Sequence, residues 1–176
     1  AGSYIVSISD ANLCSGSAAV LINEPTALNV VILSQSPVTC NGDCDGDATS
    51  LVSGGTPPYT YQWNDIGTQT TVTAVNLCAG TYGLTVEDDN GCTDTVSVVI
   101  VQPPVITLTT SALDAHCGLS DGSACVTAIG GNGLYGYSWD DPGTQNTSCA
   151  FNIPAGLYNV VVTDILGCTA TIGVTV

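Results

Sequence analysis

The chain repeats itself, and this repeat limits which folds it can adopt. The segment AGSYIVSISDANLC at residue 1 recurs as AGTYGLTVEDDNGC at residue 79 and as AGLYNVVVTDILGC at residue 155. A second block, CNGDCDGDATSLVSGGTPPYTYQWND, begins at Cys40 and returns as CGLSDGSACVTAIGGNGLYGYSWDD at Cys117. Self-similarity at a fixed spacing indicates an array of like units. We therefore expect two complete units, preceded by the last strands of another.

Proline-containing segments separate the units. Pro25 in NEPTAL and Pro103 in VQPPVI each lie eleven residues after the last cysteine of a copy. Because proline and glycine interrupt regular strands, these segments are typical of short linkers. The expected divisions are 1–25 for the C-terminal strands of a partial repeat, and 26–102 and 103–176 for two complete β-sandwich repeats.

Within a unit, apolar residues alternate with polar or small ones. Tyr82, Leu84 and Val86 are separated by Gly83 and Thr85. A period of two indicates a strand with one buried face and one solvent-exposed face. Turn-forming clusters such as SGGTPP, NDIGTQ and GGNG separate short runs of this kind, and no segment has the period of a helix. The pattern predicts an all-β fold.

Aromatic residues narrow this fold to tandem immunoglobulin-like β-sandwiches. Trp63 and Trp139 end the segments YTYQW and YGYSW, like the core tryptophan of a middle strand. Tyr4, Tyr82 and Tyr158 each follow a glycine and one further residue, as in a tyrosine corner. Nine cysteines in so small a chain predict that disulfides stabilise these units.

The charge of the chain excludes several classes of partner. It has no Lys or Arg and fifteen Asp plus Glu residues. Binding to nucleic acid phosphates or anionic lipid headgroups depends on basic side chains, so neither is an expected partner. No apolar run approaches the roughly 20 residues that a transmembrane helix needs, so no membrane span is expected. Oxidised cysteines favour an extracellular protein.

Several ordered motifs resemble one repeat family. The patterns C-x-G-x-x-D-G-x-A, GGTPPYTYQW, LCAGTYGLTVEDDNGC and a closing QPP are similar to the SprB repeat of gliding-motility surface adhesins. The AGTY and W-N-D elements are also similar to polycystic-kidney-disease-type modules, which are immunoglobulin-like. The resemblance implies a cell-surface or secreted protein of gliding bacteria, exported by type IX secretion and used for adhesion. It implies no catalytic residue and no particular ligand.

Two cysteine positions are shared by both complete units. Cys40 aligns with Cys117, and Cys92 aligns with Cys168. We therefore expect disulfides Cys40–Cys92 and Cys117–Cys168, each joining the start of a unit to its last hairpin. Four cysteines in a unit permit three connectivities, so this comparison favours one pattern among three. Each bridge would add roughly 3 to 4 kcal/mol to the stability of its unit.

The remaining cysteines differ between the units. Cys125 and Cys149 stand where the first unit has Thr49 and Thr73, which favours positions that face each other across strands and predicts a disulfide Cys125–Cys149. By elimination, Cys44 is predicted to pair with Cys78. Cys14 aligns with Cys92 and Cys168, so its partner is expected in a preceding repeat or in another subunit.

Catalysis is not expected. His116 precedes Cys117, but adjacent residues in a strand point in opposite directions, whereas a nucleophile and its base must face each other. There is no Lys or Arg to stabilise a developing negative charge. No C-x-x-C spacing indicates a zinc site. We therefore expect a protein that is not an enzyme.

One segment has the composition of a calcium loop. In NGDCDGD, Asp43, Asp45 and Asp47 alternate around Gly46, although the distal Glu of an EF-hand is missing. Asp and Gly also form ordinary solvated turns, so both interpretations stay open. Calcium is the one possible cofactor.

Two short patterns nominate glycosylation sites. Asn146 lies in the sequon NTS, and Thr95 lies in DTV, which resembles an O-glycosylation signal of the bacteria that make such repeats.

Two functions remain. The first is an extracellular structural array, a surface fibre or adhesin stalk, whose partners are copies of itself or adjacent repeats. The alternative is a calcium-assisted module that binds a surface polysaccharide or another surface. Lysine on an exposed edge strand commonly prevents that strand from pairing with another chain. This chain has no lysine, which favours pairing of its edge strands with neighbouring chains.

Overall fold

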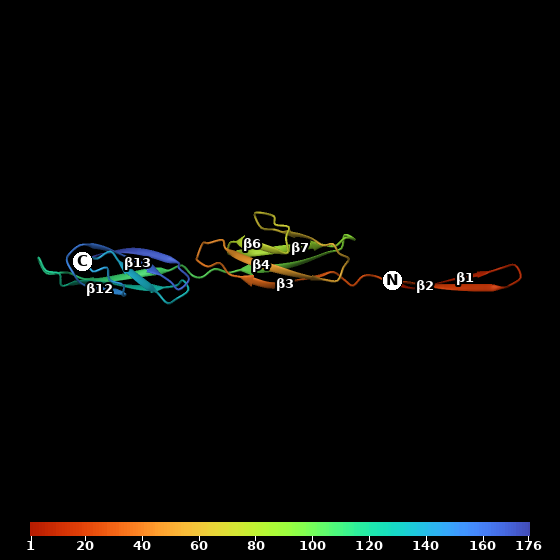
Figure 1. Cartoon of the computed structure of the whole chain (residues 1–176), viewed down its shortest axis with the longest axis horizontal. Coiled ribbons are helices and arrows are strands. Elements are labelled where there is room, and N and C mark those ends of the chain that lie inside the picture. The colour runs from red at the N-terminus through yellow and green to blue at the C-terminus, as the bar shows by residue number, and fades with distance from the viewer.

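The computed structural model describes residues 1–176 and contains fourteen β-strands and no helix, so the predicted all-β fold is confirmed. A hairpin and two sandwiches follow one another along a single long axis (Figure 1). The hairpin consists of β1 (Gly2–Ser9) and β2 (Ser15–Ile22). None of the chain forms a helix of the length and hydrophobicity needed to cross a membrane.

The first sandwich packs two three-stranded antiparallel sheets face to face. One sheet has the order β3-β4-β6, and the other has the order β5-β7-β8. Their strands are β3 (Asn29–Ser36), β4 (Gly46–Ser53), β5 (Thr60–Trp63), β6 (Thr73–Leu77), β7 (Gly80–Glu87) and β8 (Thr93–Ile100). The backbone N–H of Val30 on β3 donates to Oδ2 of Asp94 on β8 at 2.8 Å, which ties the two sheets together at one edge.

The second sandwich repeats this arrangement with the sheet orders β9-β10-β12 and β11-β13-β14. Its strands are β9 (Thr107–Leu113), β10 (Gly122–Ile129), β11 (Gly136–Trp139), β12 (Cys149–Ile153), β13 (Leu157–Thr163) and β14 (Thr169–Thr175). In both sandwiches, the first, second and fourth strands form one sheet and the third, fifth and sixth form the other. This is the A-B-E and C-F-G order of an immunoglobulin constant-type sandwich without its D strand.

Alternating side chains build a separate core in each sandwich. Each core contains ten buried hydrophobic residues. Trp63 and Trp139 are buried in their cores, and each donates its indole N–H to a backbone carbonyl at 2.9 Å, of Thr71 and Thr147 respectively. A buried tryptophan whose N–H is satisfied contributes a large apolar area without leaving a polar group unpaired.

The predicted tyrosine corner forms in both sandwiches. The hydroxyl of Tyr82 donates to the carbonyl of Cys78 at 3.0 Å, and that of Tyr158 donates to the carbonyl of Pro154 at 2.9 Å. Each bond runs four residues back along the chain and fixes the entry into β7 or β13, as in immunoglobulin domains.

The hairpin has the strands of a sandwich without the rest of it. β1 pairs with β2 in the register that β7 has with β8, with Tyr4 opposite Val20 as Tyr82 is opposite Val98. No second sheet lies over it, and Tyr4, Val20 and their apolar neighbours are exposed.

Candidate functional site

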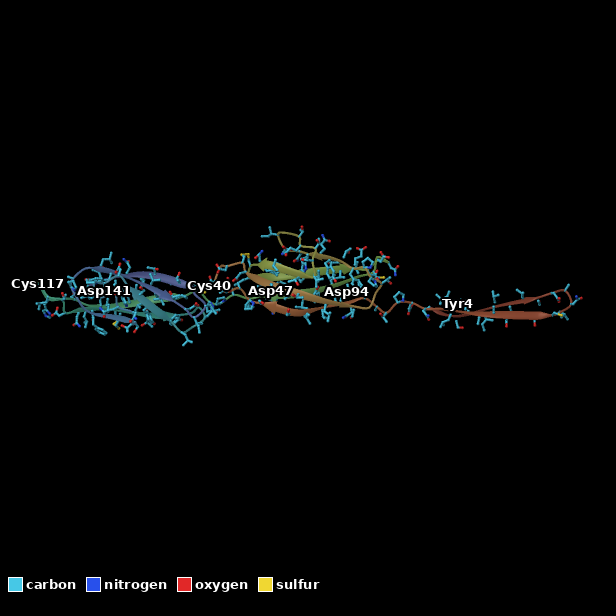
Figure 2. All side chains as sticks on the ribbon, viewed as in Figure 1. Tyr4, Cys40, Asp47, Asp94, Cys117 and Asp141 are labelled. Atoms are coloured by element: carbon cyan, nitrogen blue, oxygen red, sulfur yellow. A yellow bond between two sulfur atoms is a disulfide. The ribbon has the colours of Figure 1, made fainter.

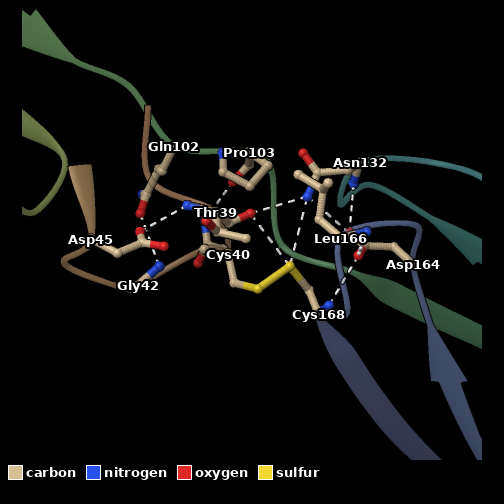
Figure 3. The surroundings of a disulfide bond; sticks show 11 residues. Thr39, Cys40, Gly42, Asp45, Gln102, Pro103, Asn132, Asp164, Leu166 and Cys168 are labelled. Carbon is tan, nitrogen blue, oxygen red and sulfur yellow. Dashed lines mark hydrogen bonds between the residues drawn. A yellow bond between two sulfur atoms is a disulfide. The ribbon is translucent and has the colours of Figure 1, made fainter. Parts of the chain in front are cut away.

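The contact between the two sandwiches combines a disulfide with several polar contacts. We call it the joint. It consists of the β3–β4 loop (37–45), the linker between sandwiches (101–106), the β10–β11 loop (130–135) and the β13–β14 turn (164–168). Figure 3 shows these four segments meeting around a disulfide.

That disulfide joins Cys40 of the first sandwich to Cys168 of the second, 128 positions later, with their Cα atoms 5.5 Å apart. It therefore corrects the predicted pairs Cys40–Cys92 and Cys117–Cys168, neither of which forms. Cys14, Cys92 and Cys117 are free and exposed. The bond is a covalent connection between successive units, whereas the predicted bonds lay within units.

Strand direction explains the correction. At the end of the first sandwich that faces the second, Gly46 at the start of β4 lies opposite Leu77, and Cys40 lies in the loop just before it. β7 runs from this end to the other, where Cys92 closes the turn into β8. An eight-residue strand spans about 26 Å, and a disulfide needs Cα atoms within about 7 Å. Cys40 and Cys92 therefore cannot bond within one sandwich.

Hydrogen bonds surround the disulfide and connect the same segments. The Asn132 side-chain amide donates to the carbonyl of Thr39 across the joint at 3.1 Å. The Asn41 amide donates to the carbonyl of Pro103 at 2.9 Å. The backbone N–H of Gly42 donates to the side-chain oxygen of Gln102 at 3.0 Å. Loop, linker and following unit are thus held by several directional bonds, which restricts rotation about the linker.

A buried carboxylate, Asp164, shapes the half of the joint that belongs to the second sandwich. Its two oxygens accept backbone N–H bonds from Asn132 at 2.8 Å, and from Leu166 and Cys168 at 2.9 Å. Burial alone would raise the pKa of Asp164, but these hydrogen bonds to the charged form outweigh it and lower the pKa below its usual value. The ionised carboxylate presents Cys168 to the first sandwich.

A second carboxylate, Asp45, shapes the other half. Its Oδ1 accepts the backbone N–H of Thr39 at 2.9 Å, and hydrogen bonding from Thr39 lowers the pKa of Asp45. This bond closes the β3–β4 loop around Cys40. The second sandwich has the same closure in its β9–β10 loop, where the N–H of His116 donates to Oδ1 of Asp121 at 2.8 Å.

The structure also forms two disulfides within units, each with the pairing expected from the sequence. Cys44 bonds to Cys78, and Cys125 bonds to Cys149. In the first sandwich the positions of the second pair hold Thr49 and Thr73, whose hydroxyls hydrogen-bond at 2.9 Å. The same cross-strand position is thus linked by a hydrogen bond in one unit and by a disulfide in the other.

The structure does not bring Asp43, Asp45 and Asp47 together as calcium ligands. No group of three or more His, Cys, Asp or Glu side chains in the chain is arranged to hold a metal ion. One oxygen of Asp45 is used by Thr39, as described above. Within this loop, the carboxylate of Asp45 closes the turn that carries Cys40.

His116 and Cys117 are both exposed at the far end of the second sandwich. The Nδ1 atom of His116 lies 2.7 Å from Oδ2 of Asp121, so the ring contacts the carboxylate that closes its own loop. Figure 2 shows Cys117 at the extreme end of the molecule and Cys40 between the sandwiches.

Both nominated glycosylation residues are exposed. Thr95 lies on β8, beside a shallow hollow of about 520 Å³ that is also lined by Trp63 and Asn64. Asn146 lies in the loop between β11 and β12. Modification at either residue stays a prediction.

The sequence interpretation missed the joint, although one signal pointed to it. In an immunoglobulin-like sandwich the B–C and F–G loops lie at one end, which leaves the A–B loop at the other. Cys40 and Cys92 occupy the A–B and F–G positions, so the predicted fold itself placed them apart.

Comparison with known proteins supports the repeat family identified from the motifs. Residues 32–68 match the SprB repeat, which confirms the resemblance over that stretch. None of the curated proteins compared with the chain matches it. Together, the SprB repeat and the three disulfides indicate an extracellular repeat module.

Two solved structures show a low overall similarity. The first is Dpr2 Ig1–Ig2 in complex with DIP-Theta Ig1–Ig3, with a TM-score of 0.36, 11% identity, and coverage of 99% of this chain and 72% of that one. The second is DIP-gamma Ig1+Ig2, with a TM-score of 0.37, 11% identity, and coverage of 84% and 96% respectively. The immunoglobulin-like description rests on the strand order given above.

Proposed function

We propose that the chain is a segment of an extracellular stalk or fibre, in which β-sandwiches are linked end to end to give reach. The observation that carries this proposal is the Cys40–Cys168 disulfide between successive units. A binding module needs no covalent bond between its units. A mechanical element benefits from one, because the bond resists both bending and separation of the units.

The length of the connection supports the same function. Six residues, 101–106, connect β8 of the first sandwich to β9 of the second, and two of them are prolines. A short proline-containing linker is stiffer than a flexible one. Gln102 and Pro103 of the linker bond to the Cys40 loop, and the Asn132 amide and the disulfide join that loop to the second sandwich. The two sandwiches should therefore move as one body.

The chemistry of the chain suits exposure outside a cell. Without Lys or Arg it offers no cleavage site to trypsin-like proteases. The SprB match supports display on the surface of a gliding bacterium, export by type IX secretion, and a role in adhesion, as expected for adhesins with this repeat.

Small-angle X-ray scattering tests the proposal. The oxidised chain should scatter as a semi-rigid rod, and the double variant Cys40→Ser, Cys168→Ser should show a broader distribution of distances between its two sandwiches. Cys117→Ser is the matched control, because it removes an exposed free thiol and should leave the scattering unchanged. Equal flexibility of the oxidised chain and the double variant would contradict a mechanical role for the joint.

A further inference from the structure

The first sandwich carries an unfilled copy of the joint at its other end. A hollow of about 440 Å³ is lined by linker residues 24–28, Gly55, Asp88, Asn90 and Cys92. The hollow at the joint is lined by the equivalent linker residues 103–106 together with Gly131 and Cys168, and there the Cys40 loop of the preceding sandwich forms the remaining wall. The site at Cys92 lacks only that loop.

The turn that presents Cys92 has the geometry of the turn that presents Cys168. Asp88 accepts backbone N–H bonds from Thr56 at 2.9 Å, from Asn90 at 2.9 Å and from Cys92 at 2.8 Å. Asp164 makes the corresponding three bonds in the second sandwich. The linkers also match, because six residues separate β2 from β3, as six separate β8 from β9. The thiol of Cys92 is free and exposed, whereas that of Cys168 is bonded.

An apolar surface lies next to this site on the hairpin. Tyr4, Val6 and Ile8 of β1 and Val20 and Ile22 of β2 point to one face of the hairpin and are 51% to 71% exposed. In the first sandwich the equivalent face of β7 and β8 is covered by β3, β4 and β6. Strands placed over the hairpin as β3, β4 and β6 are placed over β7 and β8 would cover this face. Their first loop, equivalent to the β3–β4 loop, would then lie at Cys92.

We propose that the hairpin face and the Cys92 hollow together form one docking surface for the first four strands of another unit of this repeat, equivalent to β3–β6. In the docked unit, the residue equivalent to Trp63 would pair with Val6 of the hairpin, as Trp63 pairs with Leu84 in the first sandwich. The cysteine of its first loop, equivalent to Cys40, bonds to Cys92. This inference rests on the proposed stalk or fibre function, and it identifies another repeat unit as the partner that binds the hairpin face and the Cys92 hollow.

The covalent step is the oxidation of two thiols. Cys92 and the loop cysteine together lose two protons and two electrons and gain one S–S bond. A small-molecule disulfide, such as oxidised glutathione, accepts the electrons and leaves as two thiols. The reaction proceeds through a mixed disulfide, so the docked loop needs only to hold its sulfur beside that of Cys92.

The test uses the complete chain and a separate peptide of residues 26–79 as the probe, with its Cys44–Cys78 bond formed beforehand. The two are incubated in a glutathione buffer and analysed by non-reducing electrophoresis and peptide mapping. A cross-link between Cys40 of the probe and Cys92 of the chain is expected, together with slower amide exchange in β1 and β2. A probe that bonds instead to Cys14, Cys117 or Cys168, or that does not bond, would overturn the proposal.

Two hairpin variants separate docking from chance collision of thiols. Val6→Asp places a carboxylate on the face to be covered and should lower the cross-link yield at least about tenfold, because burying an unpaired charge is costly. Leu21→Asp places the same group on the opposite face and should leave the yield unchanged. Equal yields from the two variants would show that the hairpin face takes no part.

This experiment and the scattering experiment fail independently. Loss of the Cys92 cross-link leaves the Cys40–Cys168 joint and its rigidity intact. A flexible joint would contradict the stalk, while a cross-link to Cys92 would still establish the docking surface.

Discussion

The same pair of strands occurs in the hairpin and in the first sandwich, in the same register but in different surroundings. Leu84 of β7 is 1% exposed, whereas Val6 at the equivalent position of β1 is 65% exposed. Val86 and Ile8 differ in the same way, at 0% and 71%. Strand pairing and the turn are therefore encoded within about twenty residues, and burial depends on a second sheet that arrives from elsewhere. An isolated hairpin of this kind is marginal in water.

The largest expected difference between the two settings concerns a core side chain. Leu84→Ala should lower the free energy of unfolding of the first sandwich by about 2–5 kcal/mol, because it leaves a cavity in a packed core. Val6→Ala at the equivalent hairpin position should change it by less than about 0.5 kcal/mol, as surface substitutions do. Denaturant unfolding followed by Trp63 fluorescence, with Trp139→Phe in every chain compared so that only the first sandwich is observed, measures both. Similar losses from the two variants would mean that the hairpin is also packed against a core.

The tyrosine corner gives a smaller difference. Tyr82→Phe removes the hydrogen bond to the carbonyl of Cys78 and should cost about 0.5–1.5 kcal/mol. Tyr4→Phe removes the hydroxyl of a tyrosine that is 55% exposed on the hairpin and should have no measurable effect on either sandwich. The same unfolding measurement applies. Equal losses of unfolding free energy from Tyr4→Phe and Tyr82→Phe would contradict the difference proposed between the hairpin and the first sandwich.

The smallest expected effect is a loss of stability of the first sandwich at acidic pH. Hydrogen bonds from backbone N–H groups, that of Cys92 foremost, lower the pKa of Asp88 in the folded chain. A carboxylate with a lowered pKa adds stability above its unfolded pKa of about 3.9, and this stability is lost as the pH falls through the lower folded value. The first sandwich should therefore lose stability below about pH 4. Asp88→Asn should flatten this dependence, and an unchanged slope in a pH series of melting curves would argue against the role of Asp88.

Features that depend on neighbouring residues could be read from the sequence. Alternation of Tyr82, Leu84 and Val86 gave the strand and its buried face, because a side-chain period of two is a local property. The paired replacement of Thr49 and Thr73 by Cys125 and Cys149 indicated a cross-strand contact for the same reason. Similar turns at Cys14, Cys92 and Cys168 also follow from local residues, since Asp10, Asp88 and Asp164 each bond to the backbone N–H of the cysteine four positions later.

Features that depend on how whole units meet could not be read in the same way. Aligning Cys40 with Cys117 showed that the cysteines are equivalent, but equivalence does not say whether a bond lies within a unit or between units. The Asp residues around Gly46 fitted a calcium loop by composition, whereas the use of Asp45 in closing the Cys40 loop depends on Thr39 and on the position of β4. Predicting the joint requires the directions of the strands in each sandwich and the path of the linker, and no local sequence pattern contains that information.

Disulfide mapping of the native protein tests the joint most directly. Free thiols are first blocked, and the unreduced chain is then digested with proteases that cleave at Asp and Glu, because there is no Lys or Arg for trypsin. Mass spectrometry should find the peptide containing Cys40 linked to the peptide containing Cys168, and blocked thiols at Cys14 and Cys117. Cys92 should also carry the blocking group in a chain to which no further unit has docked. A peptide linking Cys40 to Cys92, with Cys168 bonded to Cys117, would contradict a covalent joint between the sandwiches.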